Sequence, residues 1–329
     1  MKGRTLLIVL SIVGGIVLAC AILPLGGMAL LLAAGSSGAG PRPPITWQEQ
    51  TISGSGTDRI VVIEVEGIIG AADETSLLSN QLTHEELLSQ VHQATDDPQV
   101  KAVVLRIDSP GGGVVASNEI HSALKKLRAA GKHLVVSMGS VAASGGYYIA
   151  TPGERIYANP DTLTGSLGVI ISLLNYQEAF DKLGLRTIVY KSGTFKDIGS
   201  PEREPTPEEA AILQGLVDQA YEGFIDVIVE GRNLPPQEVR RIADGRIYTG
   251  KQALDLKLID ALGGLDDAIA EAQKLAGLDQ ALVVRYRAAN SFRDLLLGAL
   301  AQHQRPADPL GLRALAQPQW PRLEYRMVP

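Results

Sequence analysis

The sequence has little cysteine, few aromatic residues and no excess of positive charge. Cys20 is the only cysteine in a chain of 329 residues, which excludes an internal disulfide and a cysteine-based zinc site. Aromatic residues make up 5% of the chain and the formal net charge is −6. Because no basic cluster with interleaved aromatics offsets that charge, a nucleic acid is not an expected partner. Any catalysis must therefore use oxygen and nitrogen groups.

Charged side chains are also missing from the stretch Thr5–Pro41, most of which is aliphatic or glycine. About 20 apolar residues suffice to cross a bilayer. Lys2 and Arg4 precede the run, so the positive-inside rule places the N-terminus in the cytoplasm and the rest of the chain outside it. We predict a single-pass anchor at residues 1–34 in the cell membrane. A cleaved signal peptide and lipid modification at Cys20 are the alternatives, and the apolar run beyond Cys20 favours the anchor.

Composition divides the rest of the chain into three parts. Residues 35–58 are rich in Gly, Ser, Pro and Thr, which predicts a flexible linker. Residues 59–287 alternate β-branched runs with amphipathic stretches, a pattern typical of an α/β domain. Residues 288–329 contain several prolines and are predicted to form an irregular tail or an interaction arm.

A βαβ crossover is predicted in the first half of the domain. The apolar strand Lys101–Ile107 leads into the glycine loop Asp108–Gly113, then into an amphipathic helix that closes at Gly131 and a strand over His133–Met138. Loops at the carboxyl ends of such strands form binding crevices. The loop contains neither GxGxxG nor Gly-Lys-Ser/Thr, so two interpretations stay open: a phosphate loop, or a loop that offers N–H groups to an oxyanion.

Local signals predict further elements. Thr83–Glu86 matches a capping box before a helix that stops ahead of Pro98. A helix is expected over about Leu174–Leu183, and a strand over Leu185–Tyr190. A long amphipathic helix is expected from Pro207 to about Gly231, because proline is permitted in the first turn and two glutamates follow it.

The stretch Ser137–Ala150 crowds small residues around one hydroxyl, that of Ser144. The pattern predicts a strand, a tight turn and the start of a helix. Small neighbours allow a substrate to approach closely, and a helix N-terminus directs free N–H groups toward it. Ser144 is therefore a candidate nucleophile, although a turn that only packs closely has the same composition.

A serine hydroxyl attacks well only when a neighbouring base takes its proton. The chain has five histidines: His84, His92, His121, His133 and His303. None lies at the strand end that carries Ser144, which disfavours a histidine base but leaves it open. Lys196 lies in a loop at a predicted strand end. A lysine can act as a base near neutral pH only when its pKa falls by several units from about 10.4.

Four motifs occur in a fixed order along the chain: Ile107–Gly113 (IDSPGGG), Ser140–Tyr148 (SVAASGGYY), Leu163–Val169 (LTGSLGV) and Lys191–Pro201 (KSGTFKDIGSP). Together they resemble the short-form signal peptide peptidase A family, over roughly Arg59–Leu275. The resemblance implies a Clp protease/crotonase-like fold, a repeated ββα superhelix, with a Ser/Lys dyad, no metal, no cofactor and assembly into a homo-oligomeric ring. It also implies the roles of five residues: Ser144 as nucleophile, Lys196 as general base, Ser166 as a hydroxyl that orients the lysine, and the N–H groups of Gly111 and Gly145 as the oxyanion hole.

The expected function is that of a membrane-anchored serine endopeptidase that degrades cleaved signal peptides. Its expected partners are these peptides, the lipid bilayer and further copies of the chain, with the dyad completed between neighbouring subunits. Two alternatives are a crotonase-type acyl-CoA enzyme, which needs neither an anchor nor a serine nucleophile, and a noncatalytic membrane scaffold of the same fold.

Overall fold

The computed structural model describes residues 47–70, 82–288 and 323–327. The predicted membrane anchor, residues 1–34, lies outside these ranges. Within them, no helix has both the length and the apolar character needed to span a bilayer.

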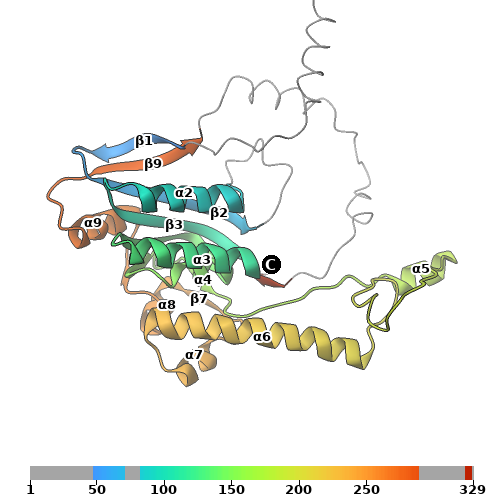
Figure 1. Cartoon of the computed structure of the whole chain (residues 1–329). Coiled ribbons are helices and arrows are strands. Elements are labelled where there is room, and N and C mark those ends of the chain that lie inside the picture. The colour runs from blue at the N-terminus through green and yellow to red at the C-terminus, as the bar shows by residue number, and fades with distance from the viewer. Residues whose placement is uncertain (1–46, 71–81, 289–322, 328–329) are drawn as a thin grey trace, which may run out of the picture. The chain divides into compact units, whose positions relative to one another are not determined.

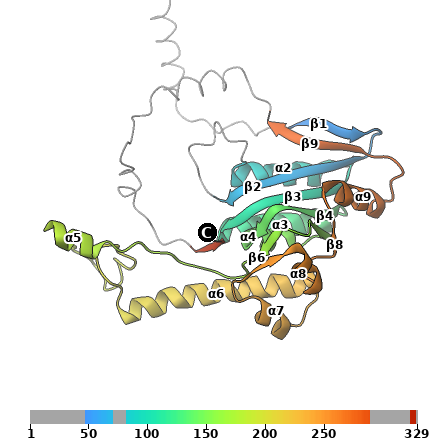
Figure 2. The same cartoon turned by 180° about the vertical axis from the view of Figure 1, so that it is seen from behind.

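A mixed β-sheet forms the centre of the described domain (Figures 1 and 2). Its strands are β1 (Trp47–Gly54), β2 (Arg59–Ile69), β3 (Val100–Gly113), β4 (His133–Ala143), β5 (Arg155–Ala158), β6 (Leu163–Gly165), β7 (Ile247–Thr249), β8 (Ala261–Leu262), β9 (Leu282–Ala288) and β10 (Glu324–Arg326). They follow the order β1-β9-β2-β3-β4-β5-β8, with β10 beside β3 and β6 between β4 and β7. The pairs β2–β3, β3–β4, β4–β5 and β5–β8 are parallel, whereas β1–β9 and β3–β10 are antiparallel.

Helices cover both faces of this sheet. They are α2 (His84–Asp96), α3 (Val114–Ala129), α4 (Gly145–Ala150), α5 (Gln177–Leu183), α6 (Pro207–Arg232), α7 (Pro236–Ile242), α8 (Gly250–Asp255) and α9 (Leu265–Leu275). Successive strand residues point to opposite faces. In β2, Val61 and Ile63 join the core under α2 and α3, whereas Ile60 and Val62 join a second core with Ala268 of α9. Burial on both faces explains why β2 and β3 are almost continuously apolar.

Several predictions from sequence are confirmed. The domain is α/β, and β3, α3 and β4 form the predicted parallel crossover. In the capping box before α2, the Thr83 hydroxyl accepts from the Glu86 N–H (3.2 Å) and the Glu86 carboxylate accepts from the Thr83 N–H (2.8 Å). The long helix α6 begins at Pro207, as predicted, and ends at Arg232. The repeated ββα superhelix stays a prediction.

The predicted limits of the domain need correction. Part of the predicted linker 35–58 is β1, which pairs with β9 from Trp47↔Ala288 to Gly54↔Leu282. Of the side chains of β1, only that of Trp47 is buried, so the strand has the polar composition of a linker. The predicted irregular tail 288–329 contains β10, and β9 itself extends to Ala288.

The predicted strand Leu185–Tyr190 does not form. All of these residues are exposed and without secondary structure, and the preceding helix α5 begins at Gln177 instead of about Leu174. An apolar β-branched run forms a strand only when another strand pairs with it and a layer covers it, and the described residues supply neither to this segment. It leads instead into the loop that carries Lys196.

Candidate active site

Ser144 lies where β4 ends and α4 begins, in the predicted strand–turn–helix arrangement. Its φ is 53° and its ψ is −115°, a conformation that residues other than glycine rarely adopt. Backbone hydrogen bonds hold it there: its N–H donates to the Gly165 carbonyl and its carbonyl accepts from the Tyr148 N–H, both at 2.8 Å. Such strain costs about 1–3 kcal/mol and concentrates at functional sites.

The Ser144 hydroxyl is buried, and no group among the described residues hydrogen-bonds to it. Buried polar groups normally have a partner, so the Ser144 hydroxyl is an exception that the described residues do not explain. Of the five histidines, three contact other groups, His92 is exposed on α2, and His303 lies outside the described residues. His133 contacts Glu154 at 3.3 Å, and His84 contacts Glu119 at 3.0 Å. His121 packs edge-on against Tyr148, and burial lowers its pKa to about 4.

Gly111 and Gly145, the predicted oxyanion-hole residues, lie against each other. A Cβ on Gly111 would lie 2.7 Å from the Gly145 nitrogen, and the φ of Gly111 is +101°, so only glycine fits this turn of the loop. The Gly111 N–H, however, donates to the Ser109 hydroxyl at 3.1 Å. The nitrogen of Gly112 lies 3.1 Å from the Cβ position of Gly145. Gly112 lies opposite Tyr325 in the pairing of β3 with β10 and opposite Ile69 in the pairing of β3 with β2. The oxyanion-hole roles of Gly111 and Gly145 stay predictions.

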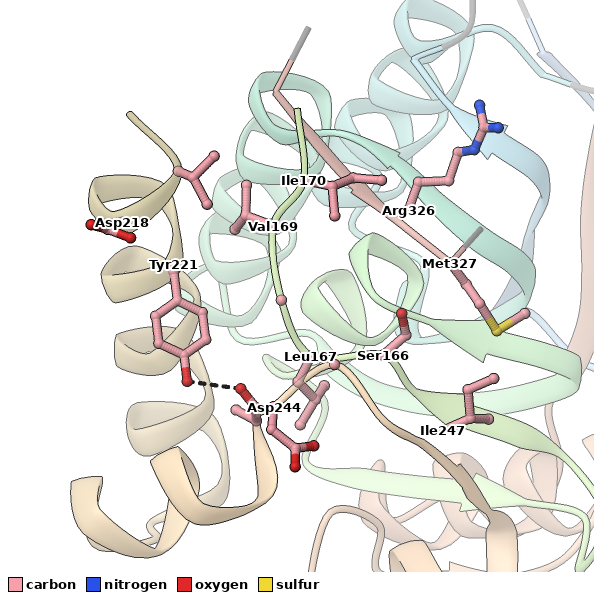
Figure 3. A pocket seen from close by; sticks show the side chains of 14 residues that line it. Ser166, Leu167, Val169, Ile170, Asp218, Tyr221, Asp244, Ile247, Arg326 and Met327 are labelled. Atoms are coloured by element: carbon pink, nitrogen blue, oxygen red, sulfur yellow. Dashed lines mark hydrogen bonds between the residues drawn. The ribbon is translucent and has the colours of Figure 1, made fainter. Parts of the chain in front are cut away.

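Ser166 has a left-handed backbone, with φ of 49°, and its N–H donates to the Arg246 carbonyl at 2.7 Å. It follows β6, the strand that pairs with the end of β4 just before Ser144. Ser166 lines a cavity of about 560 Å³, together with Tyr221, Asp244 and Met327 among others (Figure 3). Ser166, which is predicted to orient the lysine, therefore lines an open cavity beside the end of β4 that leads to Ser144.

Lys196 lies in the loop between α5 and α6, where its side chain is exposed. Its backbone N–H donates to the Gly193 carbonyl at 3.1 Å, and its ammonium group has no hydrogen bond or ion pair among the described residues. In Figures 1 and 2, α5 and this loop lie away from the sheet, beyond one end of α6. The described chain thus brings Ser144, Gly111, Gly145 and the β6 end together, but it does not bring Lys196 to them.

Ion pairs connect the loop of Lys196 to the start of α6. Asp197 accepts from Lys191 Nζ (2.6 Å) and from Arg203 Nε (3.2 Å). Arg203 also forms a bidentate pair with Glu209, at 2.6 and 2.7 Å. These hydrogen bonds hold the pKa of Asp197 well below its usual range, and those from Arg203 and the Thr206 N–H lower the pKa of Glu209 to about 2.

Replacing Glu209 with glutamine should destabilise this connection in a pH-dependent way. Because the folded pKa of Glu209 is about 2 and its ordinary value is 4.5, its contribution is complete above pH 4.5 and is lost as the pH falls toward 2. Denaturant unfolding at a series of pH values measures this contribution. Above about pH 5 the free energy of unfolding of Glu209→Gln should be lower than that of the parent by a constant amount, and this difference should shrink below pH 4.5. Glu208→Gln, at the exposed neighbouring position, is the control. A deficit that is independent of pH would contradict the ion-pair explanation.

Asp108, the acidic residue of the glycine loop, has a structural partner. The Asp108 carboxylate accepts from the Val141 N–H at 3.0 Å, and it would lie 2.9 Å from a Cβ on Gly139, so it fixes β4 ahead of Ser144. Within the described ranges, no group of three or more His, Cys, Asp or Glu residues is arranged to hold a metal ion.

Comparisons with known proteins place the chain in a family. Residues 126–279 match the model of "Peptidase family S49". The chain is 39% identical to the "Putative signal peptide peptidase SppA" of Enterococcus faecium, over 73% of this chain and 70% of that protein. It is 34% identical to the "Serine protease SPPA, chloroplastic" of Arabidopsis thaliana, over 74% of this chain and 37% of that protein.

Among solved structures, a ClpP1 mutant from Listeria monocytogenes matches 63% of this chain and 94% of its own, with 16% identity and a TM-score of 0.41. The sequence relationships are far stronger, since they join extensive coverage with identities above 30%. The chain therefore belongs to peptidase family S49 and is a serine protease of the signal peptide peptidase A type.

Proposed function

We propose that the protein is a membrane-anchored endopeptidase that degrades signal peptides left in the bilayer, with its catalytic domain outside the cytoplasm. Membership of the peptidase family and the name of the Enterococcus faecium relative support the peptide substrate. The charge-free run Thr5–Pro41 supports the anchor. The family also favours this function over an acyl-CoA enzyme or a noncatalytic scaffold.

The observation that carries the proposal is the strained turn at Ser144, which holds a buried, unpartnered hydroxyl beside two glycine segments. The neutral amine of Lys196 takes the proton of the Ser144 hydroxyl, and the oxygen attacks the carbonyl carbon of the peptide. The N–H groups of Gly145 and of the loop Gly111–Gly112 bind the resulting oxyanion. Removing one such donor typically costs about 10²–10³ in rate. The peptide C–N bond then breaks as Lys196 gives the proton to the leaving amine. Lys196 next takes a proton from a water molecule, which attacks the acyl-enzyme, and returns that proton to the Ser144 oxygen as the ester bond breaks.

Lys196 reaches Ser144 from a neighbouring subunit in this proposal. Large apolar side chains are exposed around the Lys196 loop: Leu183 is 71% exposed, Ile188 75% and Tyr190 95%. Exposed apolar patches of this kind mark surfaces that contact other proteins. A ring of Clp protease/crotonase-like subunits would cover them and complete each Ser/Lys dyad between two copies.

Ser166 orients the incoming lysine in this scheme, so Ser166→Ala should reduce turnover by about 10- to 100-fold, less than loss of the base itself. Ser166→Gly is the matched variant, because glycine removes the same hydroxyl and relieves the left-handed backbone. Turnover should fall by the same factor in both variants, and the rising limb of the pH–rate profile should shift in both. Different losses, or an unchanged pH profile, would mean that the backbone at this position matters and the hydroxyl does not.

The function is tested with the full chain in detergent micelles and a synthetic signal peptide, whose cleavage is followed by mass spectrometry. We expect Ser144-dependent cleavage within the apolar segment of the peptide. Turnover of an acyl-CoA thioester without any peptide cleavage would refute the proposed function.

A further inference from the structure

An acidic residue follows the proposed general base directly in the sequence. Lys196 and Asp197 are neighbours in a run of tight turns, in which the Lys196 N–H donates to the Gly193 carbonyl at 3.1 Å and the Ser200 N–H donates to the Asp197 carbonyl at 3.0 Å. The side chain of Asp197 is only 16% exposed, although that of Lys196 is open to solvent. A carboxylate so close to a lysine would ordinarily pair with it.

Both carboxylate oxygens of Asp197 are instead bound to other cations. Oδ1 accepts from Lys191 Nζ at 2.6 Å, and Oδ2 accepts from Arg203 Nε at 3.2 Å. A second nitrogen of Arg203 lies 3.0 Å from Oδ1. These hydrogen bonds, from Arg203 and then from Lys191, hold the pKa of Asp197 well below its usual range. Asp197 is therefore ionised at neutral pH, and its charge is directed to Lys191 and Arg203.

Arg203 is itself fixed by the start of α6. Its guanidinium forms five hydrogen bonds: to the carboxylate and the carbonyl of Asp197, to both carboxylate oxygens of Glu209, and to the Glu204 carbonyl. A guanidinium has no further N–H group to donate. Glu209 is 2% exposed and also accepts from the Thr206 N–H at 2.9 Å. The first turn of the long helix thus anchors the guanidinium that holds Asp197.

Other charged side chains lie near this network without joining it. A cavity of about 270 Å³ is lined by Asp197 and Arg203 together with Asp181, Arg186 and Glu202. Within the described ranges, no hydrogen bond or ion pair joins the last three to Asp197. The charge of Glu209 is taken up by Arg203. Lys191 and Arg203 are therefore the cations on which the charge of Asp197 depends.

The state of this carboxylate matters for a lysine base. An amine accepts a proton only while it is neutral, and an opposite charge within about 4–6 Å favours the protonated form. Lys191 reaches Asp197 across the loop, so a lysine side chain is long enough to pair with this carboxylate. If Asp197 were free, it would offer Lys196 the same partner at shorter range along the chain.

We propose that Arg203 is a positioning residue for the reaction: with Lys191 it occupies the Asp197 carboxylate, which would otherwise pair with the Lys196 amine and keep it protonated. The inference rests on the proposed function, because it concerns the state of the proposed base. The contacts of Arg203 lie within one subunit. They therefore prepare Lys196 whether its amine serves Ser144 of the same subunit or of a neighbour.

The test compares the pH dependence of kcat/KM for signal peptide cleavage by full-chain variants. Arg203→Gln frees Asp197, so the rising limb of the profile should move upward by about one pH unit. Activity at pH 7 should fall about 10-fold, and the loss should disappear at high pH. Arg186→Gln is the matched control, because it removes the same charge from the same cavity without a bond to Asp197. It should leave the rising limb in place.

A second substitution distinguishes the freed carboxylate from the lost cation. In a chain that already carries Asp197→Asn, adding Arg203→Gln should cause no further shift, because the amide has no charge to release. An equal shift in that background would overturn the inference. A merely structural role for Arg203 predicts loss of activity by the same factor at every pH, and that result would overturn it too.

The Lys196 amine can also be followed without cleavage. The full chain carrying Ser144→Ala is acetylated with trace acetic anhydride at a series of pH values, and mass spectrometry gives the rate at Lys196. Adding Arg203→Gln should raise the midpoint by about one pH unit, since only the neutral amine reacts. That result without cleavage by any variant supports the inference and refutes the proposed function. Ser144-dependent cleavage with an unshifted midpoint overturns the inference and leaves the function intact.

A milder variant covers the case in which Arg203→Gln does not fold. Lys191 is exposed, so Lys191→Gln removes the other cation at a position where substitution is well tolerated. It frees Oδ1 of Asp197 and should raise the same midpoint, by less than Arg203→Gln would. An unchanged midpoint in folded Lys191→Gln overturns the inference.

Discussion

Replacing Ser144 with alanine should reduce peptide hydrolysis by the full chain by about 10⁵-fold or more, because loss of a serine nucleophile removes the entire acyl-transfer route. The fold should persist, since the hydroxyl has no hydrogen-bond partner among the described residues whose loss would destabilise it. Alanine and serine both carry a Cβ, so alanine should adopt the φ of 53° at this turn as readily as serine does. The measurement is single-turnover cleavage of a signal peptide, together with thermal unfolding to verify the fold.

Ser140→Ala is the matched control for this experiment. Ser140 lies on β4, the strand that ends just before Ser144, and is exposed, so loss of its hydroxyl should leave turnover within about twofold of the parent. An active-site serine reagent should label the parent and the control but not Ser144→Ala. Substantial cleavage by a folded Ser144→Ala protein would disprove the assignment of the nucleophile.

Lys196→Ala should also abolish turnover, and mixing its subunits with Ser144→Ala subunits should restore part of it. Each variant keeps the group that the other lacks, so a dyad shared between neighbours is intact at about a quarter of the sites in randomly mixed rings. The exposure of the Lys196 loop motivates this expectation. The experiment compares cleavage by the mixture, after dissociation and reassembly, with cleavage by each variant alone.

Two further measurements make the complementation experiment decisive. Lys196→Arg should be nearly as inactive as Lys196→Ala, because a guanidinium with a pKa above 12 cannot accept the serine proton. Native mass spectrometry verifies that mixed rings have formed. If confirmed mixed rings stay inactive at every ratio, each subunit carries its own dyad; if arginine supports normal rates, the base is another group.

Signals confined to a few neighbouring residues were enough to predict much of the fold. The capping box Thr83–Glu86 and the proline at position 207 specify where α2 and α6 begin, because both act through bonds within one helical turn. The crossover from β3 to β4 follows from two apolar runs around an amphipathic helix. The turn at Ser144 is also local, since small residues around one hydroxyl allow its strained backbone.

Features that depend on distant partners could not be predicted in this way. β1 is polar and becomes a strand only because β9 pairs with it from the other end of the chain. β10 is three residues long and pairs with glycines, which carry no strand preference of their own. The hydrogen bond from the Gly111 N–H to the Ser109 hydroxyl depends on the geometry of the loop, which the residue types alone do not specify.

The pairing of β1 with β9 also determines where a shortened form of the domain can begin. A shortened chain that begins at residue 59 would lose β1 and leave β9 at the margin of the sheet, with the backbone groups that now bond to β1 unpaired. Val283, Val284 and Tyr286 of β9 are buried in the intact domain, so the new margin would be apolar as well as unpaired. Edges of that kind recruit strands from other molecules and cause aggregation. A well-behaved soluble fragment must therefore begin at or before Trp47.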